Sequence, residues 1–156
     1  MWISYLIAAA GGILGGLFTE AIIKRSNVDA GRKASIVVGS LLIILGFVGI
    51  ILFVDNSNYM IFILLAGIAL FGFQFAIGNI QTLSSDLFRG PSVGTLAGLA
   101  GTVAAFSPII MNWFIGKITE GGSYTHAFIA ITLSVVLAVL AIFFFINKVK
   151  LVIDNE

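Results

Sequence analysis

Four side-chain amides stand out in a sequence that is otherwise strongly apolar. Gln74, Asn79 and Gln81 lie close together, and Asn112 follows Pro108 by one helical turn. Amides are costly in an apolar surrounding unless they are paired or face a cavity. On a helix Gln74 and Gln81 would stack while Asn79 is rotated away, so one cavity receives at most two of the three. Solute binding and hydrogen bonding between helices are the two roles open to these amides.

Few other residues could support chemistry. The sequence has no cysteine and one histidine, His126, which excludes thiolate sites and histidine clusters. Eight Lys and Arg against seven Asp and Glu leave a net charge of +1, which excludes nucleic acid as a partner. No charged residue lies in the middle of an apolar segment. We therefore predict no enzyme, no catalytic residue, no metal and no cofactor.

The elements that carry the amides must be membrane-spanning helices. Of the 156 residues, 60% are apolar and 10% are charged, far fewer charges than soluble domains carry. A helix needs about 20 apolar residues to cross the hydrocarbon core. The sequence predicts an all-α integral membrane protein with one transmembrane domain over 1–156. Its five expected transmembrane helices cover about 1–23, 34–54, 59–83, 91–116 and 126–147.

Charges between these segments predict how the chain is oriented. The expected loop at 24–33 carries Lys24, Arg25, Arg32 and Lys33, and positive loops stay in the cytoplasm. Alternation then places the N-terminus outside and the C-terminus inside. We also expect Glu20 to pair with the basic loop, and the spacing of three residues predicts a second ion pair, between Asp86 and Arg89.

Glycines mark two of the segments. The first contains Gly11, Gly12, Gly15 and Gly16, and the fourth contains glycines at 90, 94, 98 and 101. Glycines four residues apart share a helix face and let another backbone approach closely. Close packing within this chain is one interpretation; the other is that both faces slide against a partner domain.

Two stretches of sequence resemble a known family. The run GGLFTEAIIKRSNVDAGRK resembles the cytoplasmic signature loop of the major facilitator superfamily, through Gly16, Glu20, Gly31, Arg32 and Lys33. The elements SDLF at 85–88 and GSYTHAF at 122–128 are similar to the anion:cation symporter branch, near the hexuronate and other sugar-acid transporters.

The resemblance implies a fold and a function. It assigns the five segments to helices eight to twelve, a partial C-terminal half of a major facilitator fold. It implies proton-coupled symport of organic anions such as hexuronates across the bacterial inner membrane, with the missing N-terminal half, the substrate and H⁺ as partners besides the lipid bilayer. Asn79 is then a substrate contact, and Gln74 and Asn112 are further cavity residues.

Two alternatives remain at this stage. The chain could be a small self-contained membrane protein, such as an assembly or regulatory subunit or an oligomeric pore built by the glycine faces. It could also be an inactive truncated fragment. A defined homo-oligomer in mild detergent would favour the self-contained protein.

Overall fold

A computed structural model describes residues 2–53, 59–120, 124–146 and 149. Predicted segment ends at 1, 54 and 147, and the motif residues Gly122 and Ser123, lie outside this description. Every regular element in the described ranges is a helix: α1 (Trp2–Arg25), α2 (Val28–Phe53), α3 (Tyr59–Gln81), α4 (Leu83–Leu87), α5 (Pro91–Thr119) and α6 (Thr125–Phe145). With α4 counted as an extension of α3, five helices are long and apolar enough to cross a membrane. The predicted all-α membrane architecture is confirmed.

The expected basic loop at 24–33 is much shorter than predicted. α1 continues to Arg25 and α2 begins at Val28, which leaves a turn of two residues. Asn27 stabilises this turn, because its Oδ1 accepts a hydrogen bond from the backbone N–H of Ala30 at 2.7 Å. Asp29 lies in the first turn of α2, where a carboxylate interacts favourably with the helix dipole.

Three helices, α1 to α3, form a closely packed unit that we call the body. α2 and α3 meet at Gly39 and Gly72: a β-carbon added at Gly39 would lie 2.6 Å from the carbonyl oxygen of Gly72. α1 and α3 meet where Gly15 lies against Phe75, at 2.8 Å from a β-carbon to the carbonyl oxygen. These helices therefore approach each other through positions that accept no side chain.

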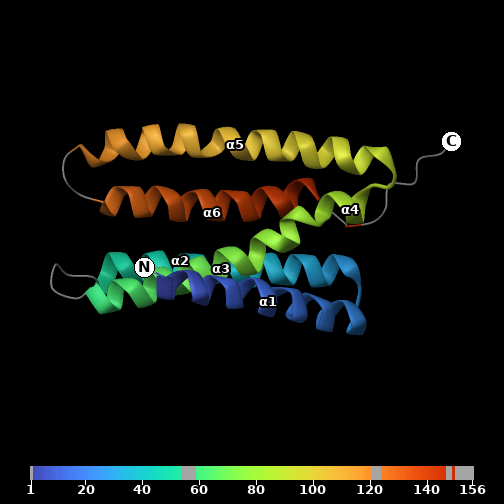
Figure 1. The fold of residues 1–156 in the computed structure, drawn as a ribbon, viewed down its shortest axis with the longest axis horizontal. Helices are drawn as coiled ribbons and strands as arrows, with labels where there is room; N and C mark the ends of the chain where they lie inside the picture. Colours follow the sequence, from blue (N-terminus) through green and yellow to red (C-terminus); the bar gives the residue numbers. More distant parts are fainter. Residues whose placement is uncertain (1, 54–58, 121–123, 147–148, 150–156) are drawn as a thin grey trace.

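The other two long helices, α5 and α6, form a hairpin beside the body (Figure 1). α5 has no buried residue among those described, and α6 has one, Ala127. The hairpin contacts the body mainly between α6 and α2. There Phe128 stacks on Phe47 with 5.7 Å between ring centroids.

The chain passes from the body to the hairpin through Gly90. Its φ of 67° is the one positive φ among the described residues, in a region that side chains disfavour. Pro91 follows at the first position of α5, where its fixed φ suits a helix start. Pro108 also lies within α5.

The glycine faces divide between packed and open positions. Gly11 and Gly15 lie against α3, as the interpretation of packing within the chain predicts. Gly12, Gly16 and the α5 glycines have open space around them: a β-carbon would meet nothing within 4 Å at Gly94, Gly98 or Gly101. The prediction that these open faces contact a partner stays a prediction.

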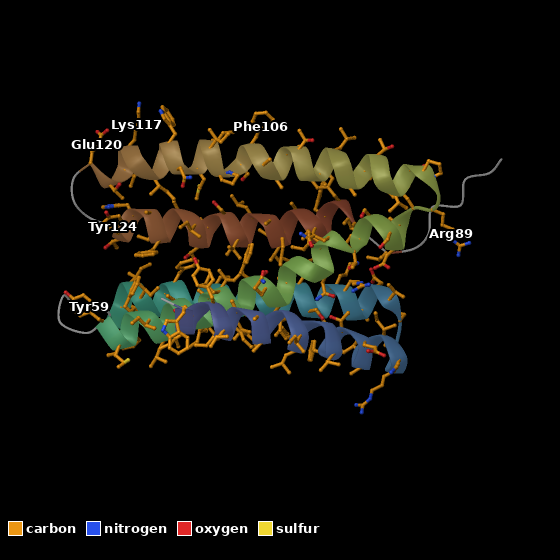
Figure 2. The ribbon with its side chains drawn as sticks, in the orientation of Figure 1. Tyr59, Arg89, Phe106, Lys117, Glu120 and Tyr124 are labelled. Atoms are coloured by element: carbon orange, nitrogen blue, oxygen red, sulfur yellow. The ribbon has the colours of Figure 1, made fainter. Side chains whose placement is uncertain are left out.

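The two ends of the helix bundle differ in the residues they carry. One end, which we call the Tyr59 end, carries Tyr59, Lys117, Glu120 and Tyr124 (Figure 2). The opposite end carries Arg89, α4 and the turn between α1 and α2 (Figures 1 and 2). We call it the Asn27 end.

Candidate functional site

Five polar side chains meet where α1, α2 and α3 approach the Asn27 end. This polar cluster consists of Thr19, Arg32, Ser35, Asn79 and Asp86, joined by the hydrogen bonds below. Ser35 is 0% exposed, Thr19 2% and Asn79 3%. Polar groups this deeply buried are stable only when their hydrogen bonds are made within the protein.

Two hydroxyl groups connect α1 and α2 to the amide of Asn79. The Oγ1 atom of Thr19 lies 2.8 Å from Asn79 Oδ1 and 2.6 Å from Ser35 Oγ. Thr19 has one hydroxyl hydrogen, which is shared between Asn79 Oδ1 and the carbonyl oxygen of Gly15 at 2.7 Å, while its oxygen can accept from Ser35. The Asn79 Nδ2 atom donates to the carbonyl oxygen of Phe75 at 3.0 Å, which fixes the amide orientation.

The guanidinium of Arg32 joins this buried amide to an acidic side chain. Its Nε donates to Asp86 Oδ2 at 2.7 Å, and its Nη1 donates to Asn79 Oδ1 at 3.0 Å. The ion pair is partly shielded, with side-chain exposures of 18% for Arg32 and 20% for Asp86. The expected pairing of Asp86 with Arg89 is wrong, because Arg32 reaches Asp86 from the start of α2.

The structure separates the three predicted substrate contacts. Asn79 lies inside the polar cluster, Gln74 is half-buried on α3, and Asn112 is exposed on α5. Within the described part of the chain, no hydrogen bond joins Gln74 or Asn112 to the cluster. The amides therefore do not form one continuous site in this conformation.

Arg32 is the member of the polar cluster whose contacts were not predicted from the sequence. Its expected place is the basic loop at 24–33, but it lies in the first turns of α2 because that helix begins at Val28. Ser35 follows it by three residues and lies on the same helix face. Had the helix been known to begin at Val28, the spacing of Arg32 and Ser35 would have predicted that both side chains face the same neighbouring helices.

The other residues of the predicted signature loop make contacts outside the hydrogen bonds of the polar cluster. Glu20 pairs with Lys24 at 2.6 Å, which confirms the expected contact with the basic segment. Gly31 is closely packed, with a β-carbon position 3.1 Å from the Thr19 carbonyl oxygen, whereas Gly16 is open. Lys33 pairs with Asp29 at 2.9 Å.

A polar cleft opens beside the cluster at the Asn27 end. It has a volume of about 300 Å³, and its lining residues are Val28, Ser85, Asp86, Arg89 and Val149. Through Asp86 the cleft reaches the ion pair of the cluster, while Asn79 lies deeper and does not line it. Arg89 and Ser85 give the cleft a guanidinium and a hydroxyl group, which can bind carboxylates and sugar hydroxyls by hydrogen bonds.

Comparison with known proteins finds two curated relatives. The chain is similar to the probable galactarate/D-glucarate transporter GarP of Escherichia coli strain K12 and to that of strain O157:H7. Each is 30% identical over 148 residues, which are 93% of this chain and 32% of the relative. The chain thus spans about a third of the length of these curated relatives. No family model and no solved structure matches.

The similarity and the helices together support a general class. The similarity covers nearly the whole chain and is to a relative whose name describes a sugar-acid transporter. Five long apolar helices agree with a multi-pass membrane protein.

Proposed function

We propose that the chain is the C-terminal part of a proton-coupled symporter for organic anions, of the sugar-acid class, within the major facilitator superfamily. The observation that carries the proposal is the similarity to a galactarate/D-glucarate transporter over 93% of the chain. Helices eight to twelve of such a transporter would correspond to the five long helices. The missing N-terminal half would supply the carboxylate needed for H⁺ coupling.

Within this proposal Asn79 is the substrate contact on α3. Its carbonyl oxygen is engaged by Thr19 and Arg32, while one of its two amide hydrogens is directed to Phe75. The second amide hydrogen is available to a sugar hydroxyl when the cluster opens. Gln74 and Asn112 are the further contacts, because their amides make no hydrogen bond to other described residues.

We further propose that the Asn27 end faces the cytoplasm of a bacterial inner membrane. Lys24, Arg25, Arg32 and Lys33 all lie at this end, and positive charge is retained on the cytoplasmic side. The opposite end carries Lys117 and Glu120, whose charges cancel.

The test is uptake of radiolabelled D-glucarate and galactarate by cells that lack their own sugar-acid uptake and express the complete gene product. Asn79→Asp keeps the carbonyl acceptor for Thr19 and Arg32 but removes both amide donors and adds a negative charge. We expect at least tenfold slower uptake at unchanged membrane abundance. Gln81→Ala removes an exposed amide from the same helix and is the matched control.

Three results would contradict parts of the proposal. Abundant wild-type protein that transports neither sugar acid would reject the substrate class. Equal uptake by wild type and Asn79→Asp would return Asn79 to a role in helix packing. Uptake by the 156-residue chain alone would reject the requirement for a further half.

A second candidate function rests on the open glycine face of α5. Gly94, Gly98 and Gly101 leave room for another helix, which is compatible with an oligomeric pore or an assembly subunit. A defined homo-oligomer of the chain in mild detergent, without sugar-acid uptake, would favour this function. A monomer or an aggregate that does not transport would instead indicate an inactive fragment.

A further inference from the structure

A single carboxylate connects the start of α2 to the chain beyond α6. Asp29 Oδ1 accepts a hydrogen bond from the backbone N–H of Val149 at 2.7 Å and pairs with Lys33 Nζ at 2.9 Å. We call Asp29, Lys33 and Val149 the Asp29 clamp. It joins residues 120 positions apart in the sequence and attaches the α6 side of the hairpin to the body.

Apolar contacts support the clamp from two sides. Val149 is 6% exposed and packs with Ile36 of α2 and Leu83 of α4. Lys33 Nζ also lies 5.8 Å from the ring centroid of Phe143 on α6, within range of a cation–π interaction. The Asn27 end of α6 is thus held by a hydrogen bond, a ring contact and one buried side chain, while the ion pair of the clamp lies within α2 and positions the two groups that make these contacts.

Between its two ends, α6 packs less completely against the body. A cavity of about 160 Å³ lies between α2, α3 and α6, and a second of about 130 Å³ lies between α2 and α6. Ser40 of α2 and Val139 of α6 line both cavities. At the Tyr59 end, α6 is held by buried Ala127 and by the stacking of Phe128 on Phe47. Helices separated by cavities lack the continuous packing that would resist movement.

The clamp also borders the polar cluster. Val149 and Asp86 line the same cleft, and Leu83, which contacts Val149, lies three residues before Asp86. Val149 therefore forms part of the cleft wall next to the ion pair between Asp86 and Arg32.

We propose that the Asp29 clamp is a releasable latch, and that its opening lets the hairpin swing away from the body about the contacts at the Tyr59 end. The contact suits release, because the Asp29 side chain is 28% exposed, so water can replace the backbone N–H of Val149 as its hydrogen-bond donor at little cost in free energy. Hinge motions occur where two packed units are joined by a weak contact, which is the arrangement of the body and the hairpin. This inference concerns conformation and does not depend on the transported solute.

These 156 residues contain no cysteine, and replacing any cysteine outside them with serine leaves the introduced thiols as the sites of labelling. The first measurement is the rate of maleimide labelling of Val149→Cys in the complete protein in native membranes. A closed latch buries this thiol, so labelling is slow. Adding Asp29→Ala removes the shared acceptor, and we expect labelling to become at least threefold faster. Adding Glu20→Ala, which removes an exposed carboxylate at the same end, should leave the rate unchanged.

The second measurement is crosslinking between Asp29→Cys and Val149→Cys with a short bifunctional thiol reagent. We expect crosslinking at least tenfold faster than for the pair Asp29→Cys and Lys117→Cys, whose second residue lies at the Tyr59 end. Equal crosslinking of the two pairs would overturn the clamp contact. Equal labelling with and without Asp29→Ala would overturn the latch, because Asp29 would then not control the release of Val149.

Discussion

The body and the hairpin are built from similarly apolar helices, yet α2 has nine buried residues and α5 has none among those described. In the body, Gly39 and Gly72 meet across the α2–α3 interface, so the two backbones come close enough for extensive contact. In the hairpin, Gly94 and Gly98 face open space. Lipid is as apolar as the side chains, so matching shape rather than hydrophobicity decides which membrane helices pack.

Polar residues follow the same division. In the body, Thr19 and Ser35 on different helices bond to each other and, through Thr19, to Asn79. In the hairpin, Thr102 and Ser134 donate to carbonyl oxygens four residues earlier on their own helices. Thr19 and Ser35 also bond back to their own helices, but each has a further partner on another helix. For Thr102 and Ser134 no such second partner is found among the described residues, so these hydroxyl groups do not specify a neighbour. The body is therefore fixed by both packing and hydrogen bonds, while the hairpin is fixed mainly where α6 meets α2.

The largest expected difference between the two regions concerns glycine substitution. In the body, a β-carbon at Gly72 would lie 2.5 Å from the Gly39 carbonyl oxygen, so Gly72→Ala forces the helices apart. We expect it to lower the free energy of unfolding by about 3 kcal/mol. The measurement is unfolding of the purified chain in mixed micelles with increasing SDS.

The matched change in the hairpin is Gly98→Ala, where a β-carbon meets nothing within 4 Å. We expect stability to stay the same or rise by up to about 1 kcal/mol, because alanine favours the helix over glycine. Equal destabilisation by the two substitutions would break the comparison, since it would mean that α5 is packed as tightly as α2 and α3.

The next effect concerns the ion pair that closes the polar cluster. Arg32→Ala leaves Asp86 without its guanidinium and removes one donor to Asn79. We expect a loss of about 2 kcal/mol in the free energy of unfolding, below the value for fully buried pairs because this pair is partly exposed. The same SDS titration measures it, and Arg32→Lys should recover part of the loss.

The control is Lys24→Ala, which breaks the exposed ion pair to Glu20 at the same end of the molecule. These side chains are 72% and 59% exposed, and we expect a loss of at most about 0.5 kcal/mol. If Lys24→Ala lowered the free energy of unfolding as much as Arg32→Ala, the loss of a positive charge at this end would explain both losses. The hydrogen bonds of the polar cluster would then not be needed to explain the effect of Arg32→Ala.

The smallest effect concerns the contact between the two regions. A double-mutant cycle of Phe47→Ala and Phe128→Ala should give a coupling free energy of about 1 kcal/mol, since the rings stack across α2 and α6. Phe144 and Phe145 provide a reference pair, because their rings are 5.3 Å apart but both are at least 80% exposed. A coupling at Phe47 and Phe128 no larger than at the reference pair would mean that the hairpin is not anchored there.

Much of the architecture could be predicted from the sequence because long uncharged segments have few structural options in lipid. Asn79 could also be singled out from the sequence, because it is a polar residue in an apolar segment. Its bonding partners could not, because they depend on the register between three helices. Thr19 and Arg32 lie 60 and 47 positions from Asn79.

The error about Asp86 has a local physical cause. Spacing of three residues predicts contact with Arg89 only while the helix continues, but α4 ends at Leu87. Arg32 instead approaches from α2, whose early start at Val28 was unexpected because charges at 24–33 were read as a loop. Charged residues mark the ends of membrane helices, and they do not by themselves show where the backbone hydrogen bonding stops.

Gly90, at the junction between the body and the hairpin, affects how far the hairpin can move. α5 contains 29 residues and is therefore about 40 Å long. A rotation of about 10° about the Tyr59 end of a helix of that length moves its Gly90 end by about 7 Å. Gly90 has no side chain, so its torsion angles can take up this displacement, while Pro91 keeps the first residue of α5 helical. The hairpin can therefore leave the body at this end without unwinding either α4 or α5.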